Sequence, residues 1–329
     1  MLDSTRIMLK NHGWRIDRFV HNYIYFAFYR PYVLFVLWLF RILAAAFSWF
    51  KPLNVILSMA FNRYHAKIIS MEDATKIFTL NEDVVATSAQ NKRIIPFTHA
   101  YKIMLKDADT VAVMDCPCIV AKKGRTELGD CAPINRCLAV GKGLASFWVD
   151  HCRKYNARYI SQQEAIDLIK DFRRRGHVTQ AFFKVATGGR TGVFCNCCPE
   201  CCVSLEATKL GQKFNSRFTQ SAPSGYSVLH DAEKCKNCGS CAKVCHFDAI
   251  EFKDSKRFFY QKWNCMGCGL CIEHCPHGAL SLYVDESKPL PLDIDLVKER
   301  FADNLGLQRD RAIKQSTCAT DATAGNNRI

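Results

Sequence analysis

The sequence predicts an α+β protein in which an N-terminal hydrophobic helix precedes a mixed cysteine-rich domain and a compact C-terminal cysteine module. Three observations predict it: a long apolar stretch near the N-terminus, alternating strand-like and helix-like patterns in the middle, and two cysteine runs that repeat. We expect a hydrophobic basic segment over 1–66, the mixed domain over 67–225, the cysteine module over 226–286 and a polar, partly disordered tail over 287–329.

The N-terminal segment combines a long apolar stretch with a local excess of positive charge. Residues 31–50 are almost wholly apolar but include Arg41, and a helix of this length would match the hydrocarbon thickness of a bilayer. A central arginine costs about 3 kcal/mol on membrane-insertion scales, so an interfacial helix fits as well as a spanning one. A buried helix in the core or at a subunit interface is the alternative.

Charge is unevenly distributed along the chain. Residues 1–70 contain nine Lys and Arg side chains but only two acidic ones, within a chain of formal net charge +14. This asymmetry indicates an acidic partner protein or an anionic membrane surface. No recognised nucleic-acid motif accompanies it, so a nucleic-acid partner is not expected.

The segment that follows predicts strands and helices in a mixed domain. The β-branched run over 110–114 predicts a short buried strand. Ser161 and Glu164 form a capping box that begins a helix, and Gly176 ends it. We expect this helix to be scaffold, with the basic run Arg173–Arg175 solvated at its end.

The 19 cysteines are the outstanding feature of the composition. An odd number argues against a closed disulfide framework, and a chain of this length does not need disulfides to compensate for a small core. The N-terminus lacks the pattern of a secretory signal. The sequence therefore predicts reduced thiols in the cytoplasm, committed to metal.

Two C-x₂-C-x₂-C-x₃-C runs repeat with an offset of 30 residues. Three closely spaced cysteines let one loop bind three corners of an iron–sulfur cubane, and the fourth cysteine ligates the other cluster. Small residues at Gly239, Gly267 and Gly269 should let backbone N–H groups approach the sulfides. The predicted ligands are Cys235, Cys238, Cys241 and Cys275 for cluster I, and Cys265, Cys268, Cys271 and Cys245 for cluster II.

The repeated module resembles the bacterial ferredoxin family with two 4Fe–4S clusters, over about 50 residues. It departs from the family at His246, where proline is usual, whereas Pro276 keeps the rule. The resemblance implies two 4Fe–4S clusters and one-electron transfer. A pair of zinc sites fits poorly, because zinc usually takes two Cys-x₂-Cys pairs for each site.

Nine further cysteines lie in the middle of the chain, and Cys152 stands apart from them as an expected core thiol. Adjacent cysteines point in different directions, so the dense run over 195–202 cannot direct all its thiols at one metal. Together the nine could hold one or two additional iron–sulfur clusters; zinc, a redox-active dithiol at Cys198 and Cys201, and plain buried thiols remain alternatives. The nine are Cys116, Cys118, Cys131, Cys137, Cys195, Cys197, Cys198, Cys201 and Cys202.

The layout over 95–285 resembles a family of uncharacterised ferredoxin proteins of anaerobe type, which implies electron transfer in anaerobic metabolism. We expect a cytoplasmic electron carrier at the inner face of the cell membrane, relaying single electrons to a membrane-associated or other protein acceptor. A reductase with a catalytic cluster or dithiol at 195–202, or a non-catalytic iron–sulfur subunit, is the alternative. A carrier is favoured over an oxidoreductase in its own right because Glu200 is the only titratable neighbour within this run.

Overall fold

A computed structural model describes residues 2–12, single positions between 20 and 42, and most of 66–299. Within the last range it leaves out 88–90, 95–101, 185–189, 199, 215–218 and 254–256. The chain divides into two compact units, Met1–Leu292 and Asp293–Ile329. In the second unit residues 294–299 are helical; everything below concerns the first unit. The segment boundaries expected from the sequence stay a prediction.

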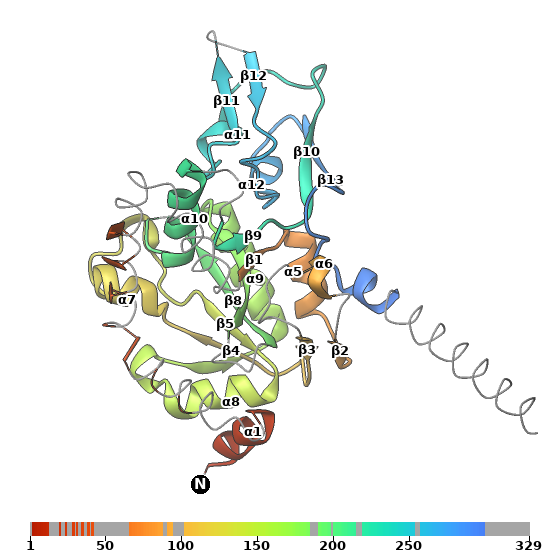
Figure 1. The fold of residues 1–329 in the computed structure, drawn as a ribbon. Helices are drawn as coiled ribbons and strands as arrows, with labels where there is room; N and C mark the ends of the chain where they lie inside the picture. Colours follow the sequence, from red (N-terminus) through yellow and green to blue (C-terminus); the bar gives the residue numbers. More distant parts are fainter. Residues whose placement is uncertain are drawn as a thin grey trace, which may run out of the picture. The chain divides into compact units, whose positions relative to one another are not determined.

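A nine-stranded, largely antiparallel sheet forms the centre of the middle region (Figure 1). Seven strands follow the order β6-β4-β5-β8-β7-β1-β9, while β3 pairs with both β2 and β8. Only the pairs β1·β9 and β3·β8 are parallel among the described strands. The strands are β1 (Ala66–Ile68), β2 (Val84–Thr87), β3 (Lys102–Leu105), β4 (Val111–Met114), β5 (Cys137–Val140), β6 (Arg158–Ile160), β7 (Val178–Lys184), β8 (Arg190–Cys197) and β9 (Ser221–Ala222).

Helices surround this sheet, and the core between them is rich in both aromatic residues and cysteine. Phe147 and Trp148 of α8 and Phe172 of α9 are fully buried, and Phe78 of α5 packs edge-on against Phe194 of β8. The helices are α1 (Asp3–His12), α5 (Met71–Phe78), α6 (Asn91–Ile94), α7 (Pro117–Lys123), α8 (Lys142–His151), α9 (Gln162–Arg174) and α10 (Val203–Phe214), with 3₁₀ turns at Gly129–Cys131 and Arg153–Tyr155.

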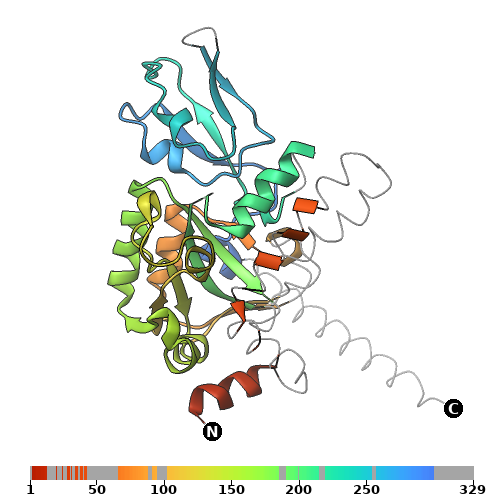
Figure 2. The ribbon, with the colours of Figure 1, turned by 90° about the vertical axis from the view of Figure 1, so that its left-hand side faces the viewer.

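The C-terminal module consists of two small antiparallel sheets and two one-turn helices (Figures 1 and 2). Strands β10 (Tyr226–His230) and β13 (Leu280–Val284) form one pair, and β11 (Ile250–Lys253) and β12 (Arg257–Tyr260) form the other. Helix α11 (Ser240–Lys243) follows the first cysteine loop and α12 (Leu270–Glu273) follows the second. The sequence repeat is thus a structural repeat.

A short linker joins the sheet to this module. Strand β9 pairs in parallel with β1, and β10 begins four residues after β9 ends. The buried Lys67 ammonium donates a 2.9 Å hydrogen bond to the Pro223 carbonyl. Ser224 donates from its backbone N–H to Met266 and from its hydroxyl to the Gly267 carbonyl. The linker is therefore attached at one end to the sheet and at the other to the second cysteine loop.

Two predicted elements of the middle region are confirmed. The run over 110–114 contains the buried strand β4. Helix α9 begins after the N-cap Ser161, whose hydroxyl accepts from the Glu164 N–H, and its buried face includes Ile169 and Phe172. Propensity and capping were sufficient to locate both, since each depends on residues close together in sequence.

The expected N-terminal helix over 31–50 falls largely on residues outside the described set, as does the tail beyond 299. Within the part of the chain that the structure describes, no helix is both long enough and apolar enough to cross a bilayer. The fold class as α+β is confirmed, whereas the hydrophobic helix stays a prediction.

Candidate metal centres

The eight cysteines of the C-terminal module line two separate cavities, four cysteines to each. Cys275 of the second run lines the first cavity, and Cys245 of the first run lines the second, as the crossed assignment expects. The groups are Cys235, Cys238, Cys241 and Cys275, and Cys245, Cys265, Cys268 and Cys271.

Backbone N–H groups point at the sulfurs of both loops in the same pattern. The amides of Asn237 and Gly267 donate to Cys235 and Cys265 at 3.4 and 3.3 Å. The amides of Ala249 and Ala279, which also lie 30 residues apart, donate to Cys245 and Cys275 at 3.4 Å each. Such donors stabilise thiolate ligands and their negatively charged cluster.

The two loops differ at one pair of equivalent positions. Asn237 and Gly267 both have left-handed backbone conformations, with φ of 52° and 66°. A Cβ atom at Gly267 would collide with the Ser224 hydroxyl and the Tyr226 carbonyl. Glycine is therefore needed in the second loop because the linker packs on it. At Gly239 a Cβ would meet nothing within 4 Å, so only the positive φ favours glycine there.

Solvent reaches the two cavities unequally. Cys238 of the first is exposed, whereas Cys265 and Cys271 of the second are buried. Burial raises the pKa of Cys268 to about 12 and that of Cys271 further. Thiolates in such surroundings need positive charge nearby, which the irons of a cluster would provide. Both cavities thus fit a cluster, and the second is the more sheltered.

The second cavity adjoins the core of the middle region. Phe247, Met266 and Leu270 line it and also belong to the hydrophobic cluster that contains the middle cysteines. Cys245 and Cys268 pack against the same cluster. The first cavity shares none of its described lining residues with that core.

Arg173 bridges the two regions. The prediction that its side chain is solvated is wrong. Its side chain is 1% exposed and forms a bidentate ion pair with Glu273. It donates at 2.6 Å to the Cys268 carbonyl and at 3.3 Å to the Thr179 hydroxyl, which in turn donates to Asn196 Oδ1. Arg173 lies four residues after the buried Ile169, so helical periodicity could have placed it on the buried face.

A third cavity lies in the middle region and is lined by most of the middle cysteines. The strand pair β5·β8 places Cys137 opposite Cys195, with their sulfurs 3.4 Å apart. Cys152 is fully buried outside this cavity, where burial raises its pKa to about 12. The cysteines that line the cavity are Cys116, Cys118, Cys137, Cys195, Cys197, Cys198, Cys201 and Cys202.

Two nitrogen donors in this third cavity lack a hydrogen-bond acceptor among the described residues. They are Arg136 Nη1 and Asn196 Nδ2, both on side chains that are about 1% exposed. The other Arg136 nitrogens donate to backbone carbonyls, and no described carboxylate pairs with this guanidinium. A buried cation and a buried unpaired donor both favour an anionic, acceptor-rich occupant. An iron–sulfur cluster, with sulfide acceptors and negative charge, fits this requirement.

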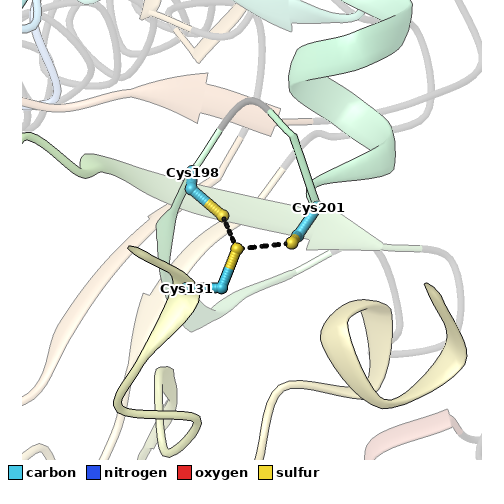
Figure 3. Close-up of side chains that lie close together, drawn as sticks. All are labelled: Cys131, Cys198 and Cys201. Atoms are coloured by element: carbon cyan, nitrogen blue, oxygen red, sulfur yellow. Dashed lines mark hydrogen bonds between the residues drawn. The ribbon is translucent and has the colours of Figure 1, made fainter. Parts of the chain in front are cut away.

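The ninth cysteine forms a tight group at one edge of the third cavity. The sulfur of Cys131 lies 3.2 Å from that of Cys198 and 2.7 Å from that of Cys201 (Figure 3). All three side chains are buried and converge on one point, although they come from a 3₁₀ turn and from the loop after β8. The three sulfurs lie within 4.8 Å of one another.

Comparison with known proteins identifies the C-terminal module. Residues 234–279 match the 4Fe–4S dicluster domain family. An uncharacterised ferredoxin of Methanocaldococcus jannaschii is 44% identical over 48 residues, 14% of this chain and 28% of that protein. A putative electron transport protein of Escherichia coli is 32% identical over 71 residues, 21% of this chain and 45% of that protein. A ferredoxin of Methanothermococcus thermolithotrophicus is 29% identical over 58 residues, 17% of this chain and 97% of that protein.

These matches confirm the ferredoxin resemblance of the C-terminal module. They span less than half the length of the first two relatives, and the family match covers residues 234–279, which exclude the middle cysteines. The individual ligand assignments and the number of clusters stay predictions.

Proposed function

Starting from a 4Fe–4S dicluster domain at residues 234–279, we propose that the protein relays single electrons between a redox partner and a centre in its own middle region. Each cluster would supply a one-electron redox couple, and the protein sets its potential through hydrogen bonds, burial and charge. Two 4Fe–4S clusters in the C-terminal module and at least one further cluster among the middle cysteines make up the relay.

The grouping of the module cysteines into two cavities carries this proposal. Four thiols line each cavity and backbone amides point at the sulfurs, which is what two crossed cubane sites require. For the middle centre the support is the pair of buried donors, Arg136 Nη1 and Asn196 Nδ2.

We infer an order for the relay from the different surroundings of the two module cavities. Exposure of Cys238 favours cluster I as the point of contact with a soluble protein partner. Arg173 contacts the Cys268 carbonyl and reaches Asn196 through Thr179, which favours cluster II as the neighbour of the middle centre.

For the far end of the relay we propose an acceptor at the membrane surface, on the inner face of the cell membrane. Phe35 and Trp38 are helical and 58% and 57% exposed, and Leu34, Leu39 and Ile42 are exposed as well. Arg41 is exposed and pairs with Glu206, its Nη2 2.7 Å from Oε1, but Lys122 pairs with the same carboxylate and a net positive charge is left. An apolar exposed side with a protein-paired arginine suits a helix lying on an anionic lipid surface.

Metal analysis of anaerobically purified full-length protein tests the relay. About eight iron atoms belong to two cubanes, so we expect more than eight per chain. Replacing Cys197 by Ser should lower the iron content and leave the EPR signal of the reduced ferredoxin module intact. Cys152→Ser is the matched control, because Cys152 is equally buried but lies outside the cavity. An iron content of only eight atoms per chain in the wild-type protein would refute a middle cluster.

Binding to lipid vesicles tests the membrane proposal. The double substitution of Phe35 and Trp38 by Glu should abolish co-sedimentation with anionic vesicles, and high salt should weaken that of the wild type. Tyr283→Glu, an exposed aromatic position of the module, should have no effect. Equal sedimentation of all three proteins would contradict the proposal.

One observation favours a second candidate, a reductase that uses Cys198 and Cys201 as a dithiol. Hydrogen bonding from Cys201 is the largest of the effects that lower the pKa of Cys198 to about 6, as in reactive Cys-x₂-Cys motifs. The reductase would replace the relay if Cys198→Ser kept its full iron content but lost a disulfide-reducing activity of the wild type.

A further inference from the structure

The nine middle cysteines fall into two groups with different sulfur spacing. In the described part of the chain, Cys131, Cys198 and Cys201 are the one set of three potential metal ligands whose donor atoms all lie within 4.8 Å. The cysteines of the two ferredoxin cavities do not come so close, although each cavity has four of them. The other six middle cysteines include one close pair, Cys137 and Cys195, but no such group of three.

Sulfur spacing distinguishes a single ion from a cluster. A four-iron cluster places irons and bridging sulfides between its ligands, so it holds any two thiolates well apart. A tetrahedral ion with metal–sulfur bonds of ~2.3 Å brings its ligand sulfurs to ~3.8 Å from one another. The Cys131–Cys198 and Cys131–Cys201 separations of 3.2 and 2.7 Å are too short for the first arrangement. They join three sulfurs in one group, unlike the cross-strand pair of Cys137 and Cys195 at 3.4 Å.

We propose that Cys131, Cys198 and Cys201 bind a single thiophilic metal ion, Zn²⁺ in the first instance, at the edge of the cluster cavity, and that they are not ligands of the cluster. The position of the ion fits the local charge. Three thiolates and a divalent ion leave a net charge of about −1. The Lys123 ammonium lies within electrostatic reach of Cys131 and Cys201, and the buried Arg136 donates to the Cys131 carbonyl.

The site has three protein ligands, so its fourth position is open. No other described His, Cys, Asp or Glu side chain brings a donor atom into this group. Lys123 is exposed, which places the group close to solvent. Structural zinc sites are closed by four protein ligands, whereas sites that bind an exogenous ligand keep one position free. We therefore expect the ion to take a water, a small thiolate or another anion, with Lys123 beside it.

The division leaves six cysteines for the cluster cavity: Cys116, Cys118, Cys137, Cys195, Cys197 and Cys202. Arg136 adjoins both sites, because it donates to the Cys131 carbonyl and also lines the cluster cavity. This inference relies on the proposed function only for the occupant of that cavity.

Zinc and iron analysis of the anaerobically purified full-length protein tests the separation. We expect about one zinc per chain in addition to the iron, and Cys131→Ser should remove the zinc without changing the iron content. Cys137→Ser should do the reverse. Cys152→Ser should change neither. The EPR signal of the reduced ferredoxin module reports whether each variant has folded.

Cobalt substitution gives a second readout that does not depend on activity. Co²⁺ bound at this site should show thiolate-to-cobalt charge-transfer absorption, which should be lost in Cys131→Ser and kept in Cys137→Ser.

If Cys131→Ser lowers the iron content and no zinc is found, the three cysteines belong to the cluster and the proposal is wrong. A Cys198–Cys201 disulfide with no bound zinc would also overturn it. A missing ferredoxin signal with zinc intact would refute the relay alone.

Discussion

The C-terminal module and the middle region both gather cysteines around cavities, but they do so by different means. In the module, two loops of one repeat supply all eight thiols from a segment of about 40 residues. In the middle region, the thiols come from 3₁₀, helical, strand and loop segments spread over 116–202, and the sheet brings them together. Cysteine spacing therefore predicts a site formed within one local motif, whereas it does not predict a site whose residues are brought together by the sheet topology.

The difference extends to the polar groups around the cysteines. Backbone amides serve the module sulfurs, and they come with the loop itself. The middle cavity instead uses buried side chains, Arg136 and Asn196, which only the tertiary fold places there. We expect substitutions in the middle region to have little effect on the module. Substitutions at module residues that contact the middle region should disturb the middle region more.

The largest effect should come from exchanging residues between the two equivalent loop positions. Gly267→Asn gives the second loop the residue of the first, and its side chain would collide with the linker at Ser224 and Tyr226. Overpacking typically costs about 1 to 3 kcal/mol, and here it would displace the second cysteine loop, so cluster II and about four irons should be lost. The reverse change, Asn237→Gly, should leave the iron content unchanged. Similar iron contents in both variants would mean that the two loops are equivalent.

Arg173→Gln should have the next largest effect, because it removes the bridge between the regions. Glu273, which is one-third exposed, and the Cys268 carbonyl would lose their partner, so the free energy of unfolding should fall by about 1.5 to 3 kcal/mol. Loss of a positive charge beside Cys268 should also lower the reduction potential of one module cluster, as measured by EPR redox titration. Arg174→Gln, at an exposed neighbouring position, should alter neither stability nor potential.

Acid should weaken the middle region through His177. Burial first, and then the charge of Arg136, lowers the pKa of His177 from 6.5 to about 4. Between these pH values His177 is protonated in the unfolded chain but not in the folded chain. The free energy of unfolding therefore falls as the pH drops from 6.5 to 4. The full difference is about 3 kcal/mol. Urea unfolding at pH 7.5 and pH 5 should detect it, and His177→Phe should flatten this part of the profile; an equally steep profile in that variant would contradict it.

The smallest effect concerns the N-terminal segment where it touches the middle cavity. Tyr29 is buried, lines this cavity, and places its hydroxyl 2.9 Å from the Cys118 sulfur. Tyr29→Phe removes one hydrogen bond at a cost of about 1 kcal/mol and should leave the iron content unchanged. Marked loss of middle-region iron in this variant would make Tyr29 part of the site.

The sequence predicted the parts of the molecule that depend on near neighbours. Spacing grouped the eight module cysteines into the two sets that line the two cavities, although their role as cluster ligands stays a prediction, and the capping box at Ser161 located α9. The proximity of Cys137 to Cys195 could not be predicted, because it follows from the register of β5 on β8. The role of Arg173 was missed since charge at a helix end is usually solvated, and only the docking of the module explains its burial.

The linker has a consequence for how electrons move inside the protein. Many carriers hold a redox domain on a flexible tether, so that transfer waits for the domain to swing. Here β9 is hydrogen-bonded to β1, Ser224 to Met266 and Gly267, and Lys288 to both β10 and the Cys265 carbonyl. With the module fastened at its second loop, transfer between cluster II and the middle centre would not require diffusion. Its rate should therefore be insensitive to solvent viscosity, whereas the encounter of cluster I with its partner should slow in glycerol.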